Sequence, residues 1–233
     1  WTASPHISAQ LPPGTNKITL SVAEETGGAI FVDNMRLDQF DENAVRLELA
    51  AIFASGATPI FIGDDQQSLA NEYYPDRSKA IPPPLKRAIR DDLSFISAYE
   101  TLLFPPEVVS LGTGTSSLVA MSGQKLIDTG ANGIWVVPRR IGPYDTLHLV
   151  NLLTLDDLWR NAKVGAPPVQ TNIKLRYYVD ATIAGVYVAS PDLNFGQATQ
   201  LPYTSGQDGR GRYVEFTVPR LVYWDMVYLR RSG

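Results

Sequence analysis

The 233-residue sequence contains no cysteine, only two histidines, and no apolar run near the roughly 20 residues that span a bilayer. The absence of cysteine excludes a disulfide framework and a thiolate metal site. His6 and His148 lie far apart in the sequence, which disfavours a histidine metal cluster and a nucleophile activated by histidine within this chain. The net charge is −4 with both signs interspersed, so neither nucleic acid nor a membrane surface is an expected partner.

The first part of the chain contains two predicted strands, "KITLSVAE" and "AIFVDNMRL", separated by Gly27-Gly28. Both alternate fairly between apolar and polar residues, and a Gly-Gly pair is typical of a β-hairpin turn. A hairpin of two strands is marginally stable by itself in water. We therefore expect this hairpin to pack against another part of a larger protein.

Residues 41–103 carry the pattern of an α/β protein. In "DENAVRLELAAIFASG", apolar residues recur at helical spacing between Asp41, a predicted N-cap, and Gly56, a predicted C-terminal stop. The run 58–62 lacks alternation, as a strand buried on both faces does, and 85–103 again has helical spacing. The order helix, buried strand, long polar loop and helix indicates parallel α/β architecture.

From residue 107 onward the pattern predicts strands, separated by clusters such as "DTGANG" and "SGQDGRG". Their spacing of roughly 8 to 12 residues is typical of an antiparallel β-sandwich. Since the single buried strand before them needs neighbours on both sides, and the chain begins with Trp1 rather than methionine, we expect the C-terminal part of a larger protein. The predicted strands are 107–111, 116–121, 133–138, 145–152, 172–179, 184–189, 197–201, 212–218 and 221–229.

The loop "FIGDDQQSLANEYYPDRS", residues 61–78, is the predicted binding site. In parallel α/β folds, ligands lie at the carboxyl ends of the strands, and this loop directly follows the predicted strand. Carboxylates and amides form paired hydrogen bonds with neighbouring hydroxyl groups, and tyrosine rings stack on sugars. The pattern therefore favours a neutral, polyhydroxylated ligand. The candidate binding residues are Asp64, Asp65, Asn71, Glu72, Tyr73 and Tyr74.

Two other interpretations of this loop stay open. Asp and Asn side chains also cap turns in solvated loops, and composition by itself favours that interpretation. Asp64 or Asp65 could form a catalytic acid pair with Glu72, since glycosidases use two carboxylates about 5 Å or more apart. Such pairs usually come from different strands, which disfavours a catalytic pair here.

His148 and three tryptophans lie in or beside predicted strands of the second half of the chain. A histidine in the alternating stretch "DTLHLVNLL" is more often structural than catalytic. Trp135, Trp159 and Trp224 could act as stacking platforms for sugars, but tryptophans buried in a β-sandwich are commoner. We therefore predict structural roles for these four side chains.

The region after residue 41 resembles glycoside hydrolase family 66, which includes dextranases and cycloisomaltooligosaccharide glucanotransferases. The segment "LANEYYP" at 69–75 is similar to a Ser-Asn-Glu-Tyr-Phe-Pro run of the family, and "AYETLL" at 98–103 is similar to its Ala-Tyr-Glu-Asn-Leu-Leu run. The stretches "LHLVNLL", "LRYYV", "VYVASPD" and "DGRGRYVEFTVPRLVYWDMVYL" resemble the family's C-terminal β domain.

The resemblance implies a fold of α/β plus all-β class, in which the last part of a (β/α)8 barrel is followed by an antiparallel β-sandwich. Residues 39–105 would be the barrel's final helix, strand and helix, and residues 106–233 the C-terminal sandwich domain. The family's nucleophilic Asp and acid/base Glu lie on earlier barrel strands, so no catalytic residue is expected in this chain. Asn71, Glu72 and Tyr73 would line the sugar subsites next to the cleaved bond.

The first hairpin resembles the closing strands of a family-35-like carbohydrate-binding module. Such modules often carry an Asp in the last strand that helps to hold a structural calcium ion, and here that residue would be Asp33. The resemblance therefore assigns residues 1–38 to the end of an inserted β-sandwich module. It implies no cofactor for catalysis.

The family resemblance implies a retaining enzyme that cleaves or cyclises α-1,6-glucan (dextran) through a glycosyl-enzyme intermediate. The expected partners are dextran and isomaltooligosaccharides, together with the N-terminal remainder of the same enzyme. An extracellular location is expected because dextran is too large to enter a cell. Two alternatives stay open: a non-catalytic carbohydrate-binding β-sandwich protein, and a structural β domain without affinity for glucans.

Overall fold

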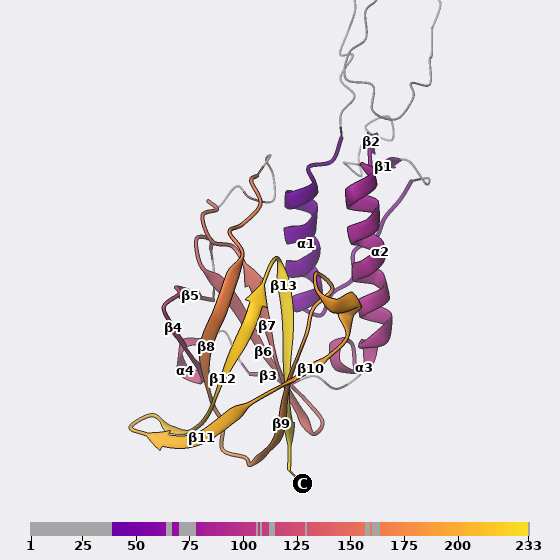
Figure 1. The fold of residues 1–233 in the computed structure, drawn as a ribbon. Helices are drawn as coiled ribbons and strands as arrows, with labels where there is room; N and C mark the ends of the chain where they lie inside the picture. Colours follow the sequence, from indigo (N-terminus) through magenta and orange to yellow (C-terminus); the bar gives the residue numbers. More distant parts are fainter. Residues whose placement is uncertain are drawn as a thin grey trace, which may run out of the picture. The chain divides into compact units, whose positions relative to one another are not determined.

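Two β-sheets and the helices α1 and α2 make up most of the regular structure in the computed structural model (Figure 1). The structure describes residues 39–63, 67–69, 78–105, 107, 109–111, 115–128, 130–156, 159 and 164–232, and this part is mostly β-sheet. The hairpin predicted before residue 38 and the predicted calcium ligand Asp33 lie outside these ranges. Within them, no helix is long and apolar enough to cross a membrane.

Helix α1, Glu42–Ala54, confirms the first predicted helix and both of its ends. The Asp41 side chain accepts a hydrogen bond from the Ala44 N–H at 2.9 Å, so it is the N-cap that the sequence predicts. Gly56 adopts a φ of 74°, the left-handed conformation in which glycine commonly ends helices. The acid before the helix and the glycine after it therefore define its length.

The second predicted helix begins earlier than expected and is broken near its end. Helix α2 spans Pro83–Ala98 and helix α3 spans Glu100–Leu103. Proline suits the first turn of α2 because its fixed φ is already helical and its missing N–H would have no partner there. Tyr99 leaves the helical conformation between the two helices, and its hydroxyl donates a hydrogen bond to the Gly196 carbonyl at 2.9 Å. The break thus attaches the helix to the β part of the chain.

The strand predicted at residues 58–62 is not formed, which corrects the expectation from the sequence. Residues 57–62 have no strand structure, and the side chains of this segment lie at the surface except for the half-buried Pro59. A parallel strand buried on both faces needs hydrogen-bonded neighbours on both edges. The described residues offer only an isolated bridge, from Gly63 to Ser68, at the end of this segment. No parallel α/β sheet is therefore present in the described part of the chain.

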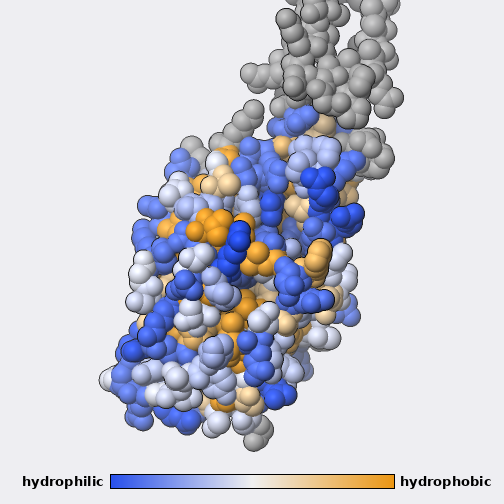
Figure 2. Space-filling model, in the orientation of Figure 1, coloured by the Kyte–Doolittle hydropathy of each residue, from blue (hydrophilic) through white to orange (hydrophobic). Residues whose placement is uncertain are grey.

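Hydrophilic residues cover most of the face shown in Figure 2, and hydrophobic residues lie there in small patches. Among the described residues, the exposed large apolar side chains include a consecutive run: Ile60 is 85%, Phe61 44% and Ile62 60% exposed. Single exposed apolar residues are ordinary on protein surfaces, but a contiguous run indicates a contact surface. Segment 60–62 therefore has the composition of a protein interior at the surface of the described structure.

The larger sheet has seven strands, in the order β10-β9-β13-β7-β6-β3, with β5 also paired to β6. Its pairs are antiparallel except for β5 with β6. The strands are β3 (Val109–Ser110), β5 (Leu126–Ile127), β6 (Ile134–Ile141), β7 (Tyr144–Asn151), β9 (Ile183–Ala189), β10 (Thr199–Leu201) and β13 (Trp224–Arg231).

The smaller sheet has four antiparallel strands in the order β11-β12-β8-β4. Its strands are β4 (Val119–Ser122), β8 (Gln170–Tyr178), β11 (Tyr203–Asp208) and β12 (Gly211–Leu221). The remaining elements are a two-stranded sheet of β1 (Gln67–Leu69) and β2 (Ser78–Ala80), the short helix α4 (Thr115–Leu118) and the 3-10 turn η1 (Asn194–Gly196).

Alternation in the sequence predicts most of these strands, with small differences at their ends. The strand predicted at 116–121 is half wrong, because residues 116–118 belong to helix α4 and β4 begins only at Val119. Four strands have no counterpart in the prediction: β1 and β2, which lie within or beside the predicted loop 61–78, and β5 and β11. Strand β5 has only two residues, and β11 has the sequence "YTSGQD", whose Ser, Gly and Asp are typical of turns. Strand β11 forms because it pairs along its whole length with β12. Tertiary pairing thus overrides the local preference.

A hydrophobic core fills the space between the two sheets. Leu149 of β7 and Val227 of β13 are fully buried on the larger sheet, and Leu175 of β8 and Phe216 of β12 belong to the same core from the smaller one. Burying a side chain of this size is worth about 1.5–3 kcal/mol. This shared core therefore holds the two sheets together.

The opposite face of the larger sheet is covered by the helices (Figure 1). Trp224 of β13 lies in this contact and is 1% exposed. Its ring stacks on Phe53 of α1 at 5.9 Å between centroids and meets Phe95 of α2 edge-on at 5.1 Å. His148 of β7 stacks on the same ring, and burial lowers its pKa to about 3. Trp224 and His148 are therefore core residues, as the sequence predicts.

Asp192, in the loop after β9, is the polar link between α1 and the larger sheet. One carboxylate oxygen accepts a hydrogen bond from Arg46 Nη2 at 2.7 Å, and the other accepts from the backbone N–H groups of Tyr223 and Trp224 at 2.8 and 2.9 Å. The Arg46 guanidinium also lies 3.9 Å from the centroid of the Tyr223 ring. The Asp192 side chain is only 5% exposed, so these three partners offset the cost of burying its charge.

Replacing Asp192 with alanine should lower the free energy of unfolding by about 3 kcal/mol, because Arg46 and two backbone N–H groups lose their partner. Urea titration measures this change. The matched control is Asp180→Ala, since that side chain is 85% exposed and lies 4.0 Å from Arg231. The control should change stability by less than about 0.5 kcal/mol. Equal effects of the two substitutions would contradict the role of Asp192.

Candidate functional site

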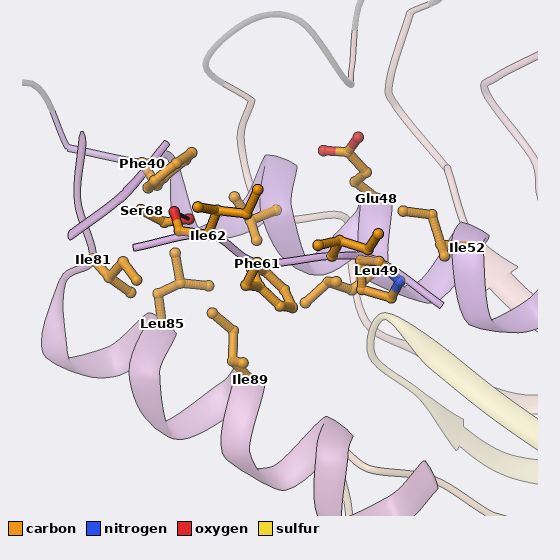
Figure 3. A pocket seen from close by; sticks show the side chains of 13 residues that line it. Phe40, Glu48, Leu49, Ile52, Phe61, Ile62, Ser68, Ile81, Leu85 and Ile89 are labelled. Carbon is orange, nitrogen blue, oxygen red and sulfur yellow. Dashed lines mark hydrogen bonds between the residues drawn. The ribbon is translucent and has the colours of Figure 1, made fainter. Parts of the chain in front are cut away.

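An apolar groove lies between α1 and α2, next to the extended segment 59–62 (Figure 3). Its volume is about 350 Å³, which is within the range of small-ligand pockets. The lining is apolar apart from Glu48 and Ser68. The apolar residues that line it are Phe40, Val45, Leu49, Ile52, Pro59, Ile60, Phe61, Ile62, Ile81, Leu85 and Ile89.

Phe61 occupies part of this groove. In Figure 3 its ring points toward Leu85 and Ile89 of α2, while the carboxylate of Glu48 on α1 points away from it. The described lining residues supply one carboxyl group and one hydroxyl group, too few for a nucleophile with its base or for a pair of catalytic acids. The groove can bind apolar groups, and its described residues give it no catalytic chemistry.

The groove also positions the root of the loop 63–78. Strands β1 and β2 pair antiparallel and form the stem of this loop. Ser68 Oγ donates a hydrogen bond to the Ile62 carbonyl at 3.2 Å. Gly63 has no room for a side chain, because a Cβ atom would clash with the backbone oxygen of Gln67. The two ends of the loop are therefore held together at the edge of the groove.

The residues predicted to bind the ligand lie in the part of this loop that is outside the described residues. This holds for all six candidates, Asp64, Asp65, Asn71, Glu72, Tyr73 and Tyr74, so their roles stay predictions. Asp33, the predicted calcium ligand, also lies outside the described ranges. Within those ranges, no group of three or more His, Asp or Glu side chains could hold a metal ion.

Asp92 of α2 is a buried acid that the sequence pattern did not single out. It is 8% exposed, whereas Leu93, which the spacing places on the buried stripe, is 46% exposed. Asp92 follows Leu85 by about two helical turns and therefore lies on the same face of the helix. Helical spacing places Asp92 on the buried face of α2, but a pattern of apolar residues by itself does not include an acid.

Burial raises the pKa of Asp92 to about 8, and the negative charge of Asp192 acts in the same direction. The positive charge of Arg46 on α1 opposes this shift, and the charge of Asp91 adds to it. Charged side chains from both helices and from the loop after β9 therefore interact where the helical pair meets the larger sheet. At neutral pH the Asp92 carboxyl group is mostly protonated.

The sequence matches the model of glycosyl hydrolase family 66 over residues 14–228. The chain belongs to glycosyl hydrolase family 66. This confirms the family resemblance that the segments at 69–75 and 98–103 indicate.

Two relatives and one solved structure define how far the similarity extends. A cycloisomaltooligosaccharide glucanotransferase from Niallia circulans is 43% identical over 234 residues, which cover 100% of this chain and 24% of the relative. A dextranase from Streptococcus salivarius is 25% identical over 183 residues, or 70% of this chain and 22% of the relative.

The solved structure is that of a Paenibacillus sp. cycloisomaltooligosaccharide glucanotransferase complexed with cycloisomaltoheptaose. It aligns with a TM-score of 0.76 and 44% identity, over 82% of this chain and 27% of that one. The chain described here thus spans about a quarter of the length of the proteins that it matches.

Replacing Asp92 with asparagine should flatten the pH dependence of stability. The carboxyl group has a pKa of about 8 in the folded chain and about 3.9 in the unfolded chain, so the folded chain binds more protons between those values. The stability of the wild type therefore falls as the pH rises through this window. Asp92→Asn removes the titrating group and should be more stable than the wild type by on the order of 2 kcal/mol near pH 8.

Urea unfolding measures the effect at about pH 5, near the lower end of this window, and at about pH 8, at its upper end. Asp180→Asn is the matched control, because that side chain is 85% exposed and its charge is not among those that shift the pKa of Asp92. The control should keep the fall in stability seen in the wild type. The same fall in Asp92→Asn as in the wild type would show that Asp92 does not cause it.

Proposed function

We propose that this chain is the C-terminal part of a longer retaining enzyme that cleaves or cyclises α-1,6-glucan. The observation that carries the proposal is the 43% identity with a cycloisomaltooligosaccharide glucanotransferase over the whole of this chain. The similarity to a dextranase supports the same substrate class. The structural relative complexed with cycloisomaltoheptaose also fits a glucan ligand.

In the proposed reaction, an upstream carboxylate attacks the anomeric carbon, and the glycosidic C–O bond breaks as a carboxylic acid protonates the leaving oxygen. This step forms a covalent glycosyl-enzyme intermediate. Attack by water then releases a linear product, whereas attack by the far end of the same glucan closes a ring. Exclusion of water and placement of the acceptor decide between these outcomes.

In this proposal, residues 39–105 are the final helix, strand and helix of a (β/α)8 barrel. Helix α1 would be the seventh helix, 58–62 the eighth strand, and α2 with α3 the eighth helix. The exposure of Ile60 and Ile62 supports this assignment, because contiguous apolar side chains at a surface indicate a contact that the described residues do not provide. Strands on both edges of 58–62 would bury these side chains and close the groove around Phe61.

The loop 63–78 would then lie at the carboxyl end of the eighth strand, where ligands bind in such barrels. Its side chains would hold a sugar that does not react, which orients the scissile bond. The pairing of β1 with β2 supports this role because it holds the two ends of the loop together. The proposed subsite residues are Asp64, Asp65, Asn71, Glu72, Tyr73 and Tyr74.

Residues 106–233 are proposed to be a β-sandwich domain that follows the barrel. Residues 1–38 are proposed to be the end of an inserted carbohydrate-binding module, in which Asp33 would help to hold a calcium ion. An extracellular location fits this function because dextran is too large to enter a cell. Membership of a glycosyl hydrolase family favours an enzyme over a non-catalytic carbohydrate-binding protein.

Replacing Asn71 or Glu72 with alanine in the longer natural polypeptide should lower kcat/KM for dextran by about tenfold or more, because a displaced sugar misaligns the scissile bond. The matched control is Arg90→Ala on α2, whose side chain is 73% exposed, and its turnover should equal that of the wild type. Analysis of the products distinguishes a hydrolase, which releases linear isomaltooligosaccharides, from a transferase, which releases cyclic ones.

Two results would contradict the proposal at different levels. Unchanged turnover in both the Asn71→Ala and Glu72→Ala variants would remove the loop from the substrate site. A wild-type polypeptide that neither cleaves nor cyclises dextran would reject the proposed activity itself.

A further inference from the structure

A second hollow lies between α1 and the part of the larger sheet where β6 begins. Its volume is about 760 Å³, within the range of pockets that hold small ligands. It shares no residue with the loop 63–78. Five side chains give the hollow its chemistry. They are Glu48 of α1, Ser55 at the C-terminal cap of α1, Trp135 of β6, Asp128 between β5 and β6, and Trp159 between β7 and β8.

Both tryptophans line this hollow, and Trp135 is the less buried of the two. Trp135 is partly buried, whereas Trp159 is only 7% exposed. Neither ring packs on another aromatic ring in the part of the chain that the structure describes, unlike Trp224, which packs on Phe53 and Phe95. Indole rings offer flat apolar faces of the kind on which sugar rings stack.

The outer face of the smaller sheet also carries two aromatic rings, but cations cover them. The Arg176 guanidinium lies 4.6 Å from the centroid of the Tyr213 ring, and the Arg210 guanidinium lies 4.0 Å from that of Tyr178. Glu215 accepts a hydrogen bond from Arg176 at 2.6 Å and holds it in place. A sugar would have to displace these cations, so the hollow beside α1 is the stronger candidate.

The charged groups of the hollow are hydrogen-bond acceptors. Of its described lining residues, Glu48 and Asp128 carry carboxylates, and none is Lys, Arg or His. Among the described residues, the exposed Asp128 side chain has no hydrogen bond or ion pair. Ser55 Oγ donates to the Ala51 carbonyl at 2.7 Å, so its lone pairs stay available. An anionic ligand would be repelled, whereas a neutral ligand rich in hydroxyl groups could donate to the oxygens of Asp128 and Ser55.

We propose that this hollow binds a short stretch of neutral glucan, stacked on Trp135 and hydrogen-bonded to Asp128. The inference rests on the proposed function, since it takes the same class of substrate. A second contact with one polymer chain raises the effective concentration of that chain at the enzyme. The hollow therefore increases retention of long dextran by the protein.

Affinity electrophoresis of the longer natural polypeptide, in gels with and without soluble dextran, tests this inference. Asp128→Ala should raise the dissociation constant for dextran about three- to tenfold, the loss of affinity expected for one solvent-accessible hydrogen bond. Trp135→Ala should raise this constant as well, because the substitution removes a stacking face. The matched control is Asp180→Ala, an exposed carboxylate outside the hollow, and it should be retained like the wild type.

Thermal melting of each variant separates lost binding from lost folding, and the exposed Asp128 is the decisive position because its truncation removes no core contact. Weaker retention of Asp128→Ala at an unchanged melting temperature supports the inference. Retention equal to that of the wild type overturns it and leaves the proposed function untouched. A wild type that is neither retained nor active on dextran rejects the proposed function as well.

Discussion

The larger β-sheet is buried on both faces, and the positions of the helices and of the smaller sheet depend on that constraint. Side chains alternate along a strand, so neighbouring residues of β13 belong to different cores: Met226 packs with the helices, and Val227 packs with the smaller sheet. A shift of pairing by one residue would exchange these two sets. The register of β13 between β7 and β9 therefore determines both interfaces at once.

The attachment of the helices to this sheet determines where the root of the loop 63–78 lies. Trp224 supplies the apolar part of the attachment, and Asp192 supplies the polar part through Arg46 and two backbone N–H groups. Asp92 lies beside this ion pair and makes its surroundings sensitive to pH. Residues that follow the loop by more than a hundred positions thus position the surface from which the loop begins.

The sequence predicts those features that local chemistry determines. Asp41 and Gly56 define the ends of α1, and alternation around His148 predicts β7. Segment 58–62 shows the limit, because an apolar run forms a strand only where neighbours pair with it. Strand β11 shows the converse, since pairing with β12 makes a strand from turn-like residues. The loop residues were chosen from composition and family resemblance and stay predictions, and the hollow at Trp135 depends on a tertiary contact with α1 that no local pattern encodes.

The central claim is that 58–62 becomes a barrel strand in the longer polypeptide, where the loop that follows it forms one wall of a glucan site. The most direct measurement is a crystal structure of the longer natural polypeptide with a bound isomaltooligosaccharide. The expected result is a segment hydrogen-bonded on both edges, with Ile60 and Ile62 buried and a sugar within hydrogen-bond distance of Asn71 or Glu72. A segment that stays exposed, or a sugar bound only away from this loop, would contradict the claim.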